Sequence, residues 1–341
     1  MKWYQTEISP DSIVISSRVR LARNLENYPF PHKLDNIGRE KVISEVRTAL
    51  DKFSDEDFVY TELSERTPGE NAVLSEDHII SREFCDMPKS VKRTLAASEN
   101  GSIAIMIGEE DHLRIQSILP GLAVEKAFEK ANKIDDVISE GVAYAYDEKL
   151  GYLTSCPTNM GTGLRASVML HLPAIKECGY LKSVISLMTK IGLTVRGLYG
   201  EGSEAQGCLY QISNQITLGI SEKDTIEKLT DAVAKIVDKE TELRSKLKSA
   251  GGIAFEDRLW RAYGTLTSAR RMSFSEFVGL WSDVRLGVAC GIITAEGLRN
   301  KNLTSLLISA MPAHIIEISP EAKDAAKRDE LRATRLRSFF S

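Results

Sequence analysis

The stretch Thr154-Ser155-Cys156-Pro157-Thr158-Asn159-Met160-Gly161-Thr162-Gly163-Leu164-Arg165-Ala166-Ser167 is the most informative part of this 341-residue sequence. Its two glycines and its asparagine permit backbone conformations that expose amide hydrogens to a ligand. The stretch leads into the apolar run 168–172, and Arg165 is a natural partner for phosphate oxygens. Cys156 stands among basic groups that favour its thiolate form, although it also fits a small buried residue at a strand end. We therefore predict a turn that presents amides and a cation to an anionic ligand.

A second segment rich in arginine lies near the start of the chain, Ser16-Ser17-Arg18-Val19-Arg20-Leu21-Ala22-Arg23-Asn24. Arg18 and Arg20 are two residues apart, so on an extended strand they point to the same side. Two guanidiniums on one side form a fork that matches phosphate oxygens. The alternative for this segment is a solvated basic edge.

The third segment, Gly108-Glu109-Glu110-Asp111-His112-Leu113-Arg114-Ile115, directly follows an apolar run at 103–107 that predicts a buried strand. Three carboxylates at a strand end can hold a cation, orient a guanidinium or remove a proton. Arg114 lies close enough to add another phosphate contact. The alternative is a charged turn.

The fourth segment runs from Arg196 to Gly207 and contains four glycines, one arginine and two glutamates. This composition is typical of a mobile loop that closes over a substrate and brings in a charge. The alternative is a plain hairpin connection, which is usually shorter.

Around these segments the chain alternates strand-like and helical patterns up to about residue 220. Strands are predicted at 103–107, 141–152 and 209–218, and helices at 40–53 and 124–137. Beyond this point the pattern is nearly all helical. Ser221 is expected to cap a helix that Gly251-Gly252 stops, and Ser273, Thr294 and Ser319 are further expected caps. We predict an α+β domain at residues 1–252 and a small all-α domain at 253–341.

Composition narrows the class of protein. Lys and Arg total 44 against 48 Asp and Glu, and this balance gives no reason to expect nucleic acid or an anionic membrane as partner. No apolar run approaches the roughly 20 residues that span a bilayer, and the first seven residues lack an apolar signal region. Five widely spaced cysteines without a CxxC pair favour a reduced, cytoplasmic compartment and no bound structural metal.

Taken together, the four segments resemble the phosphagen (guanidino) kinases, the family of arginine kinase and creatine kinase. The order is the same: an SSRVR strand, an EEDHLRI segment, a CPTNxGTGLRAS turn and an RGxxGE loop. The resemblance covers roughly residues 10–220. It implies a phosphagen-kinase-like catalytic domain, with an antiparallel sheet flanked by helices, that transfers phosphate from ATP with Mg²⁺ to a guanidino group.

The resemblance also implies roles for individual residues. Those expected to bind ATP are Arg18, Arg20, His78, Arg114, Arg165 and Arg196. The catalytic carboxylate falls on Glu110, the carboxylate that holds the guanidinium in arginine-specific members falls on Glu201, and the reactive cysteine falls on Cys156. Met169 stands where the family has a second histidine beside adenine, so we expect a thioether contact to replace part of the stacking.

Two departures from the metabolite kinases concern the acceptor. Those enzymes carry a helical domain before the SSRVR strand, whereas here that strand begins at residue 16, and a helical region follows the catalytic domain. Both features resemble the bacterial protein arginine kinases, and a more open site admits an arginine on a polypeptide. In the last helix, Arg328-Asp329-Glu330-Leu331-Arg332-Ala333 matches the RDxxRA signature of that family. The resemblance implies a regulatory phosphoarginine site at Arg328, Asp329 and Arg332, and the alternative is a solvated helix face.

The expected activity is therefore phosphorylation of arginine side chains in proteins. The resemblance further implies a role in marking proteins for a Clp-type protease under stress, with an activator protein, and the helical tail suggests a homodimer. Two alternatives stay open at this point. One is a kinase of free arginine, and the other is an inactive regulator that binds phosphoarginine.

Overall fold

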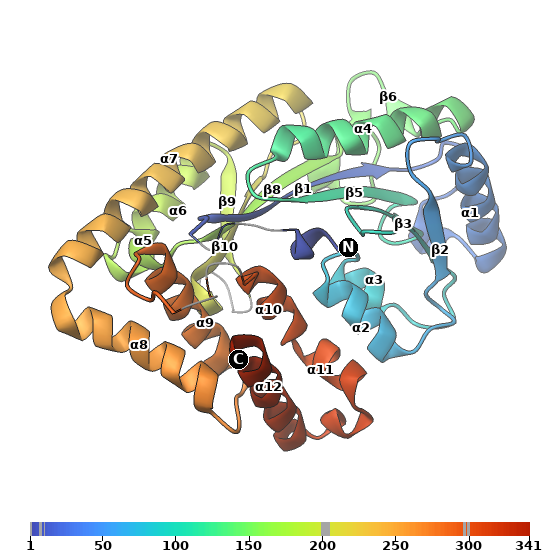
Figure 1. Cartoon of the computed structure of the whole chain (residues 1–341). Coiled ribbons are helices and arrows are strands. Elements are labelled where there is room, and N and C mark those ends of the chain that lie inside the picture. Colours follow the sequence, from blue (N-terminus) through green and yellow to red (C-terminus); the bar gives the residue numbers. More distant parts are fainter. Residues whose placement is uncertain (1, 7–8, 10, 199–204, 296–297, 299–300) are drawn as a thin grey trace. The chain divides into compact units, whose positions relative to one another are not determined.

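The computed structural model describes residues 2–6, 9, 11–198, 205–295, 298 and 301–341. An eight-stranded sheet has the order β2-β3-β4-β5-β1-β8-β10-β9 and antiparallel pairing (Figure 1). Its strands are β1 Val14–Arg23, β2 Phe58–Glu62, β3 Thr94–Ser98, β4 Ile103–Ile107, β5 Leu113–Pro120, β8 Leu164–His171, β9 Leu193–Gly197 and β10 Leu209–Asn214. The short hairpin β6 Tyr146–Asp147 and β7 Gly151–Tyr152 forms a separate pair. The predicted α+β class with an antiparallel sheet is confirmed.

Helices flank the sheet and make up most of the C-terminal region. The α-helices are α1 Asn36–Leu50, α2 Pro68–Glu76, α3 Arg82–Asp86, α4 Val124–Gly141, α5 Pro173–Glu177, α6 Leu181–Lys190, α7 Glu222–Ala250, α8 Gly252–Ser268, α9 Phe274–Ala289, α10 Leu303–Ser309, α11 Pro312–Ile318 and α12 Ala325–Phe340. Short 3₁₀ turns include η3 Pro157–Asn159, η4 Gln206–Cys208 and η6 Pro320–Lys323.

Contacts divide the chain into two compact units. Unit 1 comprises residues 1–3, 17–167 and 213–230, and unit 2 comprises residues 4–16, 168–212 and 231–341. In unit 1, α4 packs on α1 and along β5 (Figure 1). In unit 2, α8, α9 and α12 surround a core that includes Trp281, Leu259 and Leu336. The predicted domain boundary at 252/253 lies at the junction of α7 and α8, within unit 2, and stays a prediction.

Local sequence explains most element boundaries. Ser221 accepts a hydrogen bond from the amide of Asp224 at 3.0 Å and so caps α7, and Ser273 likewise caps α9 through Glu276. Gly251 separates α7 from α8, and Gly252, the first residue of α8, has φ +55°, a conformation that glycine adopts without steric cost. These predicted caps and this stop are confirmed.

Four predicted features, two strands and two helix caps, were wrong in detail. The segment 141–152 is not one strand: α4 continues to Gly141, and a turn at Asp147, which accepts the amides of Lys149 and Leu150, splits the rest into the hairpin β6–β7. Strand β10 ends at Asn214 instead of residue 218. Helix α10 is capped by Asn302 and not by Thr294, and the last helix is capped by Asp324, because Ser319-Pro320 starts only the turn η6.

Candidate active site

Two arginines of β1 lie on one side of the sheet. Burial alternates along the strand, with Val19 and Leu21 fully buried and Arg18 and Arg20 partly exposed between them. This alternation confirms that the two guanidiniums point to the same side. The spacing therefore places a pair of cations on one face of unit 1.

Arg114 on β5 and Arg165 on β8 join this pair. Burial, followed by repulsion from Arg114 and Arg165, lowers the pKa of Arg18 to about 10. Burial and repulsion from the same neighbours and Arg18 also lower the pKa of Arg20 well below its usual value. The Nε atom of Arg20 is buried without a hydrogen-bond partner in the described part of the chain. Four crowded guanidiniums of this kind are stabilised by a polyanion, and a nucleotide triphosphate is such a ligand.

The acidic segment forms the hairpin turn between β4 and β5. Gly108, with φ +88°, begins the turn, and its carbonyl accepts a hydrogen bond from Arg39 at 2.8 Å. Glu109 is buried and Glu110 is exposed. Arg114 contacts both carboxylates, at 2.8 Å for Glu109 and 3.1 Å for Glu110. Glu110 thus reaches solvent from the edge of the arginine cluster, as a proton acceptor for a bound substrate requires.

Glu109 differs from its neighbour in role as well as in exposure. Burial raises its pKa, while Arg114 and a hydrogen bond from Ser81 oppose that rise. The sequence does not single out Glu109, since nothing in an EED triplet tells which carboxylate is buried. In the structure its buried carboxylate contacts the guanidinium of Arg114 at 2.8 Å and so helps to position it.

The turn that carries Cys156 lies in the same unit. Cys156 is partly exposed, and its Sγ lies 3.0 Å from Oγ1 of Thr158. Gly161 has φ +107°, and a Cβ there would lie 2.3 Å from the carbonyl oxygen of Thr217, so only glycine fits. The predicted glycine-dependent turn is confirmed, and backbone contacts to residue 217 fix its shape.

His78 follows α2 in unit 1. Its φ of +59° is unusual for a residue with a side chain and indicates local backbone strain. Burial and the neighbouring Arg18 lower the pKa of His78 to about 4, so the imidazole is neutral at physiological pH. Proximity to Arg18 places His78 beside the arginine cluster, and a neutral ring there is suited to stack on a base.

The remaining predicted residues of the active site are not among the described residues of unit 1. Arg196 is exposed on β9 in unit 2, and Glu201 lies outside the described residues. Met169 is 9% exposed and belongs to the apolar core of unit 2 that includes Trp281. Its proposed contact with adenine stays a prediction.

The three residues predicted to bind phosphoarginine lie on α12. Arg332 is only 1% exposed, and its guanidinium donates to the carbonyls of Ala310 and Met272, both at 2.8 Å, and to Asp329 at 2.6 Å. Arg328 is partly exposed and donates to the carbonyl of Ala322 at 3.3 Å. Arg332 therefore joins three segments of unit 2, and a regulatory ligand would have to use Arg328 and Asp329.

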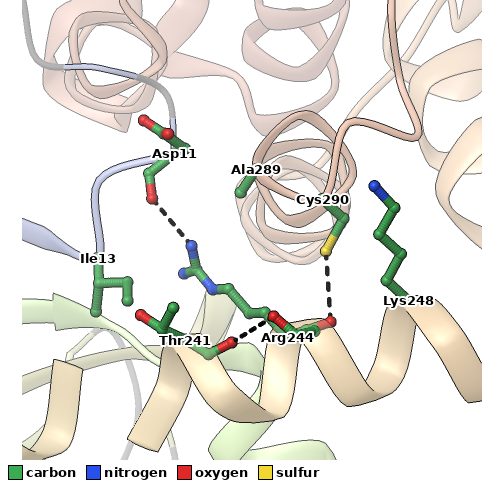
Figure 2. Close-up of a pocket in the computed structure, with 8 residues that line it drawn as sticks. Asp11, Ile13, Thr241, Arg244, Lys248, Ala289 and Cys290 are labelled. Carbon is green, nitrogen blue, oxygen red and sulfur yellow. Dashed lines mark hydrogen bonds between the residues drawn. The ribbon is translucent and has the colours of Figure 1, made fainter. Parts of the chain in front are cut away.

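A pocket of about 330 Å³ in unit 2 contains none of the predicted site residues (Figure 2). Its buried cation, Arg244, donates to Glu240 at 2.9 Å, to the carbonyl of Asp11 at 3.0 Å and to the carbonyl of His171 at 3.1 Å. The thiol of Cys290 donates to the carbonyl of Arg244. These contacts give the pocket residues a structural role in joining α7, the start of β1 and α9.

The described residues contain no cluster of three or more His, Cys, Asp or Glu side chains that could hold a metal ion. They also contain no helix long and apolar enough to cross a membrane.

The fold and the arginine cluster agree with a known enzyme class. Residues 41–243 match the family model "ATP:guanido phosphotransferase, C-terminal catalytic domain". A solved structure of lombricine kinase covers 71% of this chain and 71% of its own, with a TM-score of 0.61 and 28% identity. The duplicated taurocyamine kinase from Schistosoma mansoni gives a TM-score of 0.63 at 25% identity and covers 80% of this chain and 40% of that one. Fold and site together define an ATP-dependent guanidino phosphotransferase.

More similar relatives narrow this class. Residues 252–341 match the family model "Protein-arginine kinase McsB C-terminal domain". The protein-arginine kinase of Desulforamulus reducens is 42% identical over 98% of this chain and 94% of its own length, and that of Bacillus subtilis is 41% identical over 98% and 92%. The chain therefore belongs to the protein-arginine kinase family.

Proposed function

We propose that the protein transfers the γ-phosphate of ATP to arginine side chains of other proteins. The observation that carries this proposal is the cluster of Arg18, Arg20, Arg114 and Arg165 next to Glu110 in unit 1. The relatives named protein-arginine kinase support a protein-borne acceptor.

The arginine cluster is suited to hold the phosphates of ATP. The buried Nε of Arg20 lacks a partner in the described chain, and the crowded guanidiniums repel one another. Phosphate oxygens would satisfy both the donor and the charges. Mg²⁺ bound to the phosphates would neutralise further charge on the transferred group. His78 and Arg196 complete the proposed nucleotide site.

Acceptor chemistry would fall to three groups. A guanidinium keeps its proton up to a pH above about 12, so it must lose a proton as the N–P bond forms. We assign Glu110 as the base, with Glu201 as the second carboxylate that binds the guanidinium and Cys156 as a third group beside it. The phosphoryl group passes directly from ATP to the nitrogen, so most of the rate comes from positioning.

Arg114 would link the two halves of the site. It now contacts Glu110 at 3.1 Å, and phosphate oxygens compete for the same guanidinium. When ATP binds, Arg114 can turn toward the phosphates and leave the carboxylate of Glu110 available to the acceptor.

The test is mass spectrometry of a substrate protein after incubation with ATP, in non-acidic buffers that preserve phosphate on arginine. We expect phosphoarginine on an unfolded protein and little transfer to free arginine. Equal transfer to free arginine would favour a small-guanidine kinase, the class to which lombricine kinase and taurocyamine kinase belong by name. Loss of the signal in Glu110→Ala would show that the chain itself is the enzyme.

The wider role rests on the family alone. We propose that the protein acts in the cytoplasm as a homodimer, that arginine phosphorylation marks proteins for a Clp-type protease under stress, and that an activator protein is involved. Arginine phosphorylation in cell extracts with and without stress, compared between wild type and a Glu110→Ala strain, tests this role.

A further inference from the structure

We infer that Asp111 is a positioning residue that holds the Cys156 turn against the acidic hairpin, so that Cys156 and Glu110 keep a fixed relation. This inference rests on the proposed function, because Glu110 and Cys156 are the proposed acceptor residues. Asp111 itself need not contact the substrate.

The carboxylate of Asp111 connects two separate segments of unit 1. Its side chain is only 1% exposed. One oxygen, Oδ1, accepts hydrogen bonds from Nδ2 of Asn24 and from the backbone amide of Ser155, both at 2.7 Å. Since Glu110 precedes Asp111 and Cys156 follows Ser155, one atom fixes the immediate neighbours of both proposed acceptor residues.

Asn24 forms a second link between the acidic hairpin and the segment before Cys156. Its Nδ2 also donates to the carbonyl of Leu153 at 3.0 Å, and its Oδ1 accepts the amide of His112 at 2.8 Å. The end of β1, the acidic hairpin and the segment before the Cys156 turn are thus bonded through two side chains. Buried polar networks of this kind favour one arrangement of the segments they join.

His112 secures the hairpin independently. Its Nδ1 accepts the amide of Leu25 at 3.0 Å, which leaves Nε2 to donate to the carbonyl of Pro29 at 3.0 Å. Burial lowers the pKa of His112, in agreement with this neutral form. The hairpin is therefore anchored even without Asp111, and loss of Asp111 should release mainly the Cys156 turn.

A carboxylate at position 111 lowers the stability of the fold. Its second oxygen, Oδ2, is buried without a hydrogen-bond partner among the described residues. Burying a charged group with an unsatisfied oxygen costs stability, and an asparagine of the same shape would cost less. A charge-assisted bond to the Ser155 amide is shorter and stronger than a neutral one, and this stiffness is what positioning requires.

The hydrogen bonds of Asp111 lead to the acceptor side of the site, where Oδ1 binds Asn24 and the amide of Ser155. On the ATP side, Arg18 and Arg20 are held by β1 and Arg165 by β8, and Arg114 is the link between the two sides. A change at Asp111 should therefore alter the acceptor reaction and leave ATP binding nearly intact. A residue that only stabilises the fold would affect both.

The experiment compares Asp111→Asn and Asp111→Ala with Asp147→Asn as the matched control. Asp147 also accepts two backbone amides, at 2.8 and 2.9 Å, but in the exposed β6–β7 hairpin. For Asp111→Ala we expect kcat/KM for the protein acceptor to fall about 100-fold, since a misplacement of about 1 Å costs that much. Asp111→Asn should lose less, the KM for ATP should stay within twofold, and the control should match wild type.

Alkylation of Cys156, followed by peptide mass spectrometry, reports on the turn itself. In wild type we expect ATP with acceptor to protect Cys156, and in Asp111→Ala this protection should be lost. Near-normal acceptor kinetics in Asp111→Ala, or an equal loss of ATP affinity in the folded Asp111→Asn variant, would overturn the inference. Absence of activity in wild type would instead refute the proposed function.

Discussion

Arginines dominate two regions of this molecule, and their surroundings differ. In the cluster on β1, β5 and β8, Arg18, Arg20 and their neighbours repel one another, and Arg20 keeps a buried donor unsatisfied. On α12, the buried Arg332 donates to two backbone carbonyls and to Asp329. The first arrangement lowers stability until an anion binds, and the second stabilises the fold without a ligand.

A binding arginine differs from a structural one in what surrounds its guanidinium. The guanidinium of Arg332 is almost fully buried and those of Arg18 and Arg20 are only partly exposed, so exposure alone does not decide. The difference lies in whether protein atoms already accept hydrogen bonds from the guanidinium. A donor without an acceptor is stabilised when a ligand binds, whereas a donor with one gains little. By this criterion the unsatisfied Nε of Arg20 marks the β1 cluster as a binding site for an anion. On α12, Arg332 and Asp329 bond to each other, and the partly exposed Arg328 makes one described hydrogen bond, at 3.3 Å.

The largest expected effect comes from Arg20→Ala. A transition-state arginine in phosphoryl transfer is worth about 10³–10⁵ in kcat. We expect kcat/KM to fall by at least about 10³, with unchanged or higher thermal stability, because repulsion within the cluster is relieved. Steady-state kinetics and thermal unfolding test both parts. Arg335→Ala, an exposed position on α12, is the control. A marked loss of stability in Arg20→Ala would show that Arg20 stabilises the fold, as Arg332 does, and would contradict the difference between the two regions.

Glu110→Ala should have the next largest effect. General base catalysis contributes about 10²–10⁴ in rate, so turnover should fall by that factor. ATP binding should remain nearly intact, because Glu110 is exposed and contacts only Arg114 among the cluster. Near-normal turnover in a folded variant would show that another group removes the proton.

Sequence alone could predict the site where residue type and spacing are sufficient. The common side of Arg18 and Arg20 followed from the two-residue period of a strand. The turn before Arg165 followed from the backbone conformations that glycine permits. Sequence could not tell that Glu109 is buried or that Arg332 is consumed by carbonyls of residues 60 and 22 positions away. Those facts depend on tertiary contacts that no local pattern contains. The prediction of a single strand at 141–152 failed for a local reason, because Asp147 accepts the amides of Lys149 and Leu150 and the resulting turn outweighs strand propensity.

Arg332→Ala should reduce stability with little direct effect on chemistry. The change leaves two buried carbonyls without their donor, and each lost partner costs about 1–3 kcal/mol. We expect the free energy of unfolding to fall by about 2–4 kcal/mol in urea denaturation. Arg332→Lys should recover only part, since a lysine cannot reach all three acceptors with one planar group. Unchanged stability would contradict the structural role of Arg332 and would favour a ligand-binding role for α12.

His78 gives a smaller, pH-dependent effect inside the first region. Its pKa is about 4 in the folded protein and about 6.5 in an unfolded chain. Between these values the unfolded state binds more protons, so the His78 contribution to stability is present above pH 6.5 and is lost as pH falls toward 4. Its slope cannot exceed about 1.4 kcal/mol per pH unit. The slope should shrink in His78→Gln, measured by denaturation from pH 4 to 7, and an identical slope would mean that burial and Arg18 do not lower the pKa of this imidazole.

Arg328→Ala should change stability least, and it bears most directly on whether α12 has a second role. Arg328 is partly exposed and makes one described hydrogen bond, at 3.3 Å, so its removal should alter the free energy of unfolding by less than about 0.5 kcal/mol. Binding of a phosphoarginine peptide to full-length protein is the decisive measurement, with ATP present at saturation to occupy the β1 cluster. If affinity falls in Arg328→Ala and not in Arg335→Ala, α12 contains a ligand site built on its exposed arginine around a structural Arg332. If affinity is the same in both, the arginines of the RDELRA helix are structural, and ligand binding is confined to the β1 cluster.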